Sequence, residues 1–163
     1  MRWIRSFARI GFGLLLFASM VSAQTADHGY DLMHPVQFQL GDTYLLPGDS
    51  IKIDQVRGTS DAISRGNLYE VTGTYTLASH PNATLAASVS TNENGGKSSW
   101  MRVQQVDVDQ GSGRFRLFFY METSGFPHIS LYPADRGESF AGVYFGTGSS
   151  VMPVKEHSGS GGR

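Results

Sequence analysis

The chain has 163 residues, a formal net charge of −1 and no cysteine. Because no disulfide can hold the fold, a hydrophobic core has to do so, and this length suits a single domain. Nucleic-acid binding requires a cluster of Lys and Arg, which the sequence lacks, so we expect no nucleic-acid partner.

The first residues have the pattern of a cleaved export signal. Arginines precede an apolar run from Ile10 to Met20, and Val21-Ser22-Ala23 offers the small residues of a cleavage site. The alternative is a transmembrane anchor, but a bilayer span needs about 20 apolar residues and this run is roughly half as long. We therefore expect residues 1–23 to be a signal peptide, with export to the periplasm or the extracellular space and no stable membrane insertion after cleavage.

The remaining chain divides into one domain between two polar ends. Residues 24–34 are polar and have no period, which predicts an exposed leader, and residues 155–163 are expected to form a flexible Gly/Ser tail. The segment between them, residues 35–154, is predicted to form the domain. Removing the signal would lower Lys plus Arg from 13 to 10 while Asp plus Glu stays at 14, so the net charge would move from −1 to −4.

Two short strands are expected before residue 58. Apolar and polar residues alternate in Val36–Leu40 and again in Ile51–Val56, and Pro47-Gly48-Asp49 between them is a turn signal. The polar segment Gly58–Asn67 then leads to the next strand. It is either a binding loop or a crossover between two sheets, and the crossover is favoured because sandwich folds need a few longer connections.

The clearest strand is Leu68–Leu77, in which apolar residues alternate with Glu and Thr. A tight turn is expected at Ser79-His80-Pro81-Asn82, followed by a strand from Ala83 to Val89. These two strands are predicted to form a hairpin, in which the small residues of the second strand face Tyr69 and Tyr75.

Four further strands are expected in the second half of the chain. They cover residues 100–109, with a bulge where the apolar face changes, residues 114–122, a segment around Ile129, and residues 140–146. A turn at Gln110-Gly111-Ser112-Gly113 separates the first two. In the segment around Ile129, the side chains of His128, Ser130 and Tyr132 are predicted to point outward.

About eight short strands with turn signals roughly 8–15 residues apart predict an all-β domain. We favour a single antiparallel β-sandwich with a jelly-roll-like arrangement over a closed barrel. Hairpins joined by one long crossover fit two packed sheets at least as well as they fit a barrel, so both architectures stay open.

The sequence shows no catalytic motif. It has no Gly-x-Ser-x-Gly elbow, no phosphate-binding glycine loop, no His-Glu-x-x-His and no dinucleotide fingerprint. Asp107 and Asp109 resemble the start of a calcium loop, but Phe118 stands where the distal Glu is required. The histidines have no metal-ligand spacing. No catalytic residue, metal or cofactor is therefore expected, and a hydrolase would depend on Asp135 and Glu138, which lie on a predicted turn.

Aromatic residues opposite the main apolar stripes are the best functional signal. Flat rings flanked by polar groups bind sugars, because a pyranose has an apolar face and a polar rim. The alternative is a second aromatic layer that packs under loops. The predicted ligand-binding residues are Trp100, Tyr120, His128 and Tyr132.

Three stretches carry a resemblance to known proteins: Tyr69–His80, Gly125–Pro133 and Phe140–Gly146. They resemble a group of exported bacterial β-sandwich proteins to which no activity is assigned, and this resemblance implies no catalytic residue. The alternation around Tyr69 and the pattern of Gly113–Leu117 are similar to carbohydrate-binding jelly-roll modules, a similarity of architecture that by itself implies no function.

The sequence thus predicts an exported, non-catalytic binding module with a glycan as the expected ligand. An alternative of another class is a structural or protein-interaction module of the cell envelope, whose partner would be an envelope protein. The least favoured alternative is a small hydrolase.

Overall fold

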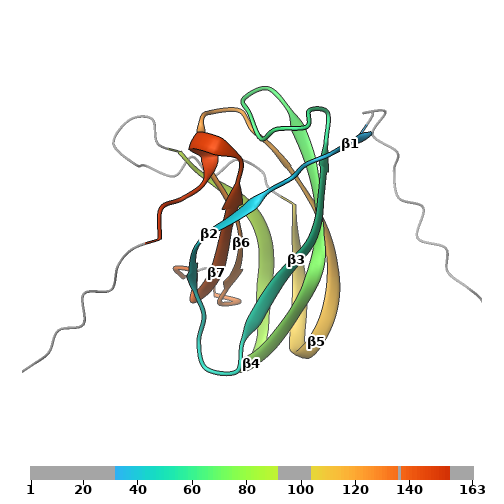
Figure 1. The fold of residues 1–163 in the computed structure, drawn as a ribbon. Helices are drawn as coiled ribbons and strands as arrows, with labels where there is room; N and C mark the ends of the chain where they lie inside the picture. Colours follow the sequence, from blue (N-terminus) through green and yellow to red (C-terminus); the bar gives the residue numbers. More distant parts are fainter. Residues whose placement is uncertain (1–31, 92–103, 136, 155–163) are drawn as a thin grey trace, which may run out of the picture.

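The computed structural model describes residues 32–91, 104–135 and 137–154 (Figure 1). The predicted signal peptide, nearly all of the predicted leader, Trp100 and the predicted tail lie outside these residues. The elements are β1 (His34–Pro35), β2 (Gln39–Tyr44), β3 (Ser50–Gly58), β4 (Leu68–Thr91), β5 (Gln105–Tyr120), β6 (Gly125–Tyr132), β7 (Ala141–Gly146) and the 3₁₀ turn η2 (Gly148–Ser150).

The seven strands form one antiparallel sheet that curls into a half-barrel (Figure 1). Its order is β1-β3-β4-β6-β7-β2, and β5 pairs with the other edge of β4. The all-β, antiparallel prediction is confirmed. Within the described residues the strands do not separate into the two sheets of a sandwich, and the jelly-roll arrangement stays a prediction.

The sheet is continuous because β4 and β5 run through segments that were predicted to be turns. Residues 79–82 lie inside β4, so the predicted hairpin is wrong, and residues 110–113 lie inside β5. The two segments lie next to each other along the β4–β5 ladder, since Leu77 pairs with Gly111 and Asn82 pairs with Asp109, which leaves a bulge in β4 between Leu77 and Asn82. A bulge bends its strand and increases the local twist. The first half of β4 therefore lies between β3 and β5, and the second half between β5 and β6.

Asp49, in the turn before β3, stabilises this bulge. Its carboxylate accepts hydrogen bonds from the backbone N–H groups of Ala78 and Ser79, at 2.8 and 3.0 Å, and from the Ser79 hydroxyl at 2.6 Å. These bonds satisfy donors that the bulge removes from the ladder. A residue distant in sequence thus replaces the local turn that the sequence favours.

The core lies inside the curl. The alternation predicted for residues 114–122 is confirmed, because Phe115, Leu117, Phe119 and Met121 are all buried. The Phe119 ring stacks on Tyr69 of β4 at a centroid distance of 5.1 Å and meets Phe145 of β7 edge-on at 5.7 Å. The β3–β5 side and the β6–β7 side of the sheet therefore share one core. Tyr69 lies beside β5 and β3 rather than opposite small residues of a hairpin partner, so that prediction is also wrong.

The connection of residues 59–67 joins β3 to β4, which are neighbours in the sheet, so it is not a crossover between two sheets. Its position is held by Tyr69, whose hydroxyl donates to the Ala62 carbonyl at 2.7 Å and accepts from the Ser64 N–H at 2.9 Å. Ile63 is buried, and its N–H donates to the hydroxyl of Thr147 at 2.8 Å. The loop therefore packs on the chain that follows β7.

Candidate functional site

The structure brings together two of the residues predicted to bind a ligand and separates a third from them. His128 and Tyr132 lie on the same face of β6, opposite Ser88 and Thr84 of β4. Tyr120 is 49% exposed at the end of β5 and pairs with Leu68, at the other end of β4. Trp100 lies outside the described residues.

The strand pattern predicts that the side chains of His128 and Ser130 are exposed on an outer face. In the structure both side chains are buried. His128 is 5% exposed and Ser130 is fully buried, although both point away from the core residues Ile129 and Leu131. Part of the reason is the neighbouring aromatic ring, because the Tyr144 ring centroid lies 4.7 Å from that of His128. Alternation identifies the side of a strand but not what covers it.

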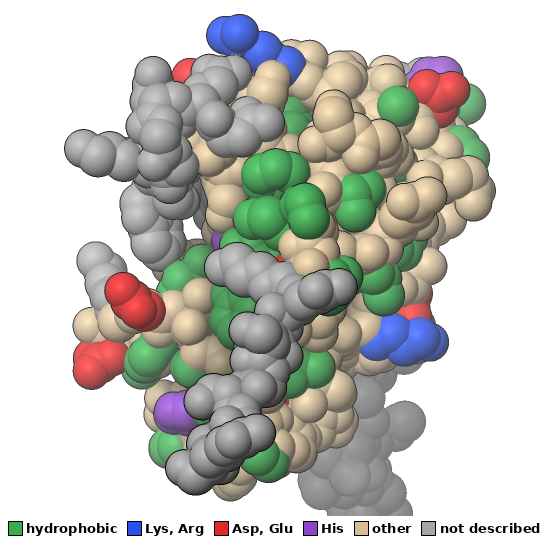
Figure 2. All heavy atoms as spheres, turned by 60° about the vertical axis from the view of Figure 1, so that its left-hand side comes forward, with side chains coloured by type: hydrophobic (Ala, Val, Ile, Leu, Met, Phe, Trp, Pro, Cys, Tyr) green, Lys and Arg blue, Asp and Glu red, His purple; other side chains and the backbone are tan. Residues whose placement is uncertain are grey.

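The residues around His128 form a polar aromatic surface, which we call the tyrosine face. Its members come from β2, β4, β6 and β7 and are Tyr44, Ser88, Ser90, His128, Ser130, Tyr132 and Tyr144. Figure 2 shows the side of the molecule that lies on the left in Figure 1, and among the side chains visible there the hydrophobic and uncharged ones occupy the middle while charged ones lie toward the margins.

The absence of a side chain at Gly142 leaves space for the hydroxyl groups of Tyr44 and Ser130. A Cβ atom at Gly142 would lie 2.6 Å from both the Ser130 hydroxyl and the Tyr44 hydroxyl. Because Gly142 has no side chain, Tyr44 on the edge strand β2 reaches across β7 toward Ser130, at an oxygen–oxygen distance of 3.4 Å, and bonds to Ser139 at 2.7 Å. The sequence analysis missed Tyr44, since no clear alternation surrounds it.

The polar contacts of His128 are long. Ser90 Oγ lies 3.4 Å from Nε2, and Ser130 Oγ lies 3.4 Å from Nδ1. Bonds of that length are weak, and no carboxylate contacts His128 in the part of the chain that the structure describes. Burial therefore dominates and lowers the pKa of His128 to about 4. The imidazole is neutral at pH 7.

Tyr132 and Tyr144 are neutral at pH 7 as well. Burial raises the pKa of Tyr132, and the neighbouring Tyr44 and Tyr144 add to this effect, while hydrogen bonds with Ser88 and Ser130 oppose it. Burial also raises the pKa of Tyr144, supported by Tyr44 and Asp42 and opposed by Ser90. Tyr132 and Tyr144 thus present half-buried rings with neutral hydroxyl groups beside the neutral imidazole of His128.

Within the described residues, the surroundings of His128 differ from those of a catalytic base. A serine nucleophile needs a base that a third group orients, and among the described residues the polar contacts of both His128 ring nitrogens are serine hydroxyls at 3.4 Å. Asp135 and Glu138, the carboxylates on which a hydrolase would depend, are both exposed. The described residues contain no group of three His, Asp or Glu placed to hold a metal ion.

Comparison of this chain with protein-family models, with curated proteins and with solved structures finds no significant match. Among the described residues, no helix has the length and apolar character needed to cross a membrane.

Proposed function

We propose that the protein is an exported, non-catalytic binding module that binds a glycan at the tyrosine face. The observation that carries this proposal is the cluster of half-buried rings from Tyr44, Tyr132 and Tyr144 around the neutral, buried His128. Export rests on the amino-terminal sequence pattern alone. We also propose that the strands have a jelly-roll arrangement, which is common among carbohydrate-binding modules.

The physical argument depends on what a neutral sugar offers. A pyranose ring packs its C–H groups against an aromatic ring and directs its hydroxyl groups to polar side chains at the rim. The rings of Tyr132 and Tyr144 are half-buried in a sheet, so little side-chain entropy is lost when a ligand packs on them. Serine and tyrosine hydroxyls both donate and accept, which matches a ligand rich in hydroxyl groups.

A protein-interaction module is the second candidate, and a separate surface favours it. β2 is an edge strand of the sheet, and Leu40 on it is 59% exposed. Leu45 and Leu46, which follow β2, are also exposed. An edge strand with apolar side chains can accept a strand from another protein, although the Asp42 N–H of β2 already donates to the Met152 carbonyl at 3.2 Å.

The test is a thermal-shift screen of the full chain against soluble polysaccharides and neutral oligosaccharides. A ligand at 100 times its dissociation constant should stabilise the protein by about 2.7 kcal/mol, which raises the melting temperature by several degrees. Tyr144→Phe keeps the ring and removes one hydroxyl, so it should weaken binding, and Tyr132→Ala should remove a stacking surface.

Tyr120→Ala is the matched control, because Tyr120 is an exposed tyrosine on another part of the sheet. A shift that Tyr144→Phe and Tyr120→Ala reduce equally would argue against the tyrosine face. If no glycan shifts the melting temperature, the glycan proposal fails and the edge strand β2 becomes the better candidate.

A further inference from the structure

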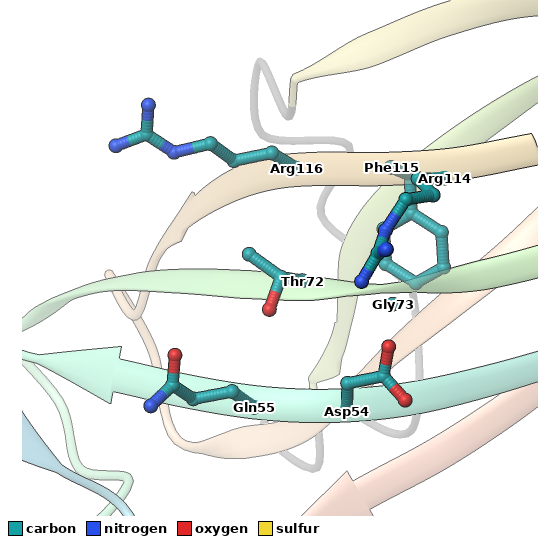
Figure 3. Close-up of a pocket in the computed structure, with 7 residues that line it drawn as sticks. All are labelled: Asp54, Gln55, Thr72, Gly73, Arg114, Phe115 and Arg116. Atoms are coloured by element: carbon teal, nitrogen blue, oxygen red, sulfur yellow. The ribbon is translucent and has the colours of Figure 1, made fainter.

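A pocket of about 540 Å³ lies on the outer face of β3, β4 and β5, away from the tyrosine face (Figure 3). Its lining residues come from these three strands and are Asp54, Gln55, Thr72, Gly73, Arg114, Phe115 and Arg116. Neither the glycan proposal nor the edge-strand alternative uses this surface.

An irregularity in β3 builds one wall of the pocket. Ile53 pairs with Gly73 and Gln55 pairs with Thr72, so Asp54 is an extra residue in the ladder. As a result, Asp54 and Gln55 are consecutive and both exposed on the outer face. A Cβ atom at Gly73 would lie 2.1 Å from the Lys52 carbonyl oxygen, so the two backbones approach closely at the pocket floor only because this residue is glycine.

The two arginines of the pocket differ in what they contact. The Nε of Arg116 donates to Glu70 at 2.7 Å, and its guanidinium lies 5.1 Å from the Phe118 ring centroid. In Figure 3 the Arg116 side chain points away from the pocket, whereas the Arg114 side chain turns across β4 toward Asp54. Arg114 forms no ion pair within the described ranges. It is therefore the cation available to a ligand.

Asp54 faces Arg114 without pairing with it. Its Oδ1 lies 3.1 Å from the Nζ of Lys52, and its other oxygen has no ion pair within the described ranges. The two strands that carry Asp54 and Arg114 flank β4, so their backbones are about 9–10 Å apart. A ligand that lies over β4 between these two side chains meets the N–H donors of the Arg114 guanidinium on one side and the acceptor oxygens of Asp54 on the other, with Thr72 and Gln55 beside it.

We propose that this pocket binds a sugar that carries a carboxylate, such as a uronate residue of an acidic polysaccharide. The guanidinium of Arg114 matches a carboxylate with two parallel hydrogen bonds. Asp54, Gln55 and Thr72 accept from and donate to the ring hydroxyls. Sulfate fits less well, because its charge would face the Asp54 carboxylate without a hydroxyl to donate to it, and inorganic phosphate offers fewer hydroxyl groups than a sugar ring does.

The test is calorimetric titration of the full chain with galacturonate oligomers, with neutral galactose oligomers of equal length, and with inorganic sulfate and phosphate. Binding of the galacturonate oligomers is expected to be tightest. Arg114→Met keeps the apolar stem and removes the charge, so it should weaken that binding at least about tenfold. Arg57→Met is the matched control, since Arg57 lies on β3 outside the pocket and should leave the affinity unchanged.

Asp54→Asn separates a sugar site from a simple anion site. It should weaken binding of the galacturonate oligomers, because it replaces a charged acceptor of the ring hydroxyls with an amide that has one uncharged acceptor oxygen, and it should strengthen binding of sulfate, because it removes a repulsive charge. If Asp54→Asn strengthens both, or if sulfate and phosphate bind as tightly as the oligomers, the pocket is only an anion site and the proposal is wrong.

The same titration distinguishes this site from the tyrosine face. Tyr144→Phe should leave galacturonate binding unchanged, and Arg114→Met should leave the binding of a neutral glycan unchanged. Galacturonate binding that Tyr144→Phe abolishes and Arg114→Met preserves would overturn this proposal and support the other. Absence of galacturonate binding would overturn it outright.

Discussion

The stability of this protein should fall in mild acid because of one buried histidine. Burial lowers the pKa of His128 from 6.5 to about 4. Between these two values the unfolded chain binds a proton that the folded chain does not, so the free energy of unfolding falls as the pH drops. Its contribution is fully present above pH 6.5 and is lost progressively down to pH 4. One pH unit is worth about 1.4 kcal/mol, so the total loss is roughly 3 kcal/mol.

The assay is urea unfolding followed by circular dichroism at pH 7.5, 6.5, 5.5 and 4.5, with wild type compared with His128→Gln. Glutamine stays neutral and keeps hydrogen-bonding groups near Ser90 and Ser130. The wild type should lose about 2–3 kcal/mol more than His128→Gln between the highest and lowest pH. His34→Gln, at an exposed histidine, should behave as wild type does. Equal pH dependence in wild type and His128→Gln would refute the argument.

Asp49 adds a second pH dependence in a lower window. Burial alone would raise its pKa, but hydrogen bonds from the Ser79 hydroxyl and from the N–H groups of Ala78 and Ser79, together with His80, lower the pKa below 3.8. A lowered carboxyl pKa stabilises the fold above the unfolded-state value, and this stability is lost as the pH falls through the folded-state value. Measurements at pH 4.5 and above therefore report mainly on His128.

Three substitutions test the packing, each measured by urea unfolding at pH 7.5. Asp49→Ala leaves three donors of the β4 bulge without their acceptor and should cost about 2–3 kcal/mol, whereas Asp61→Ala at an exposed loop position should change stability by less than about 0.5 kcal/mol. Gly73→Ala forces a methyl group against the β3 backbone and should cost at least about 2–3 kcal/mol, while Gly137→Ala, whose nearest atom would be 3.4 Å away, should be nearly neutral. Tyr69→Phe removes the hydroxyl that holds the β3–β4 loop and should cost about 1–3 kcal/mol. A Gly73→Ala protein as stable as wild type would contradict the close approach of β3 and β4.

Part of the candidate site could be predicted from the sequence. The alternation around Ile129 places His128, Ser130 and Tyr132 on one face of a strand, and the structure has them on one face of β6. The same pattern could not reveal that His128 is buried, because the neighbouring ring belongs to Tyr144 on β7. It also could not reveal Tyr44, whose approach depends on the pairing of β2 with β7 and on the missing side chain of Gly142.

The length and joining of the strands were decided by tertiary structure. Residues 79–82 and 110–113 carry strong local turn signals, yet they lie inside the neighbouring strands β4 and β5. Asp49 satisfies the donors of the bulge there, so two continuous strands replace two turns. Turn propensity depends only on residues that are adjacent in sequence. Hydrogen bonds from a loop distant in sequence, such as those of Asp49, can outweigh this local preference.

The sequence by itself determined that this protein is all-β and which side chains face the core, as in Phe115, Leu117 and Phe119. It did so because strand alternation is a local property that each short segment carries alone. Only the tertiary structure decided that the strands form one curled sheet, that His128 is buried, and that Arg114 and Asp54 face each other across a pocket. Those features depend on which strands lie side by side, and that is set by pairing and packing between residues far apart in the chain.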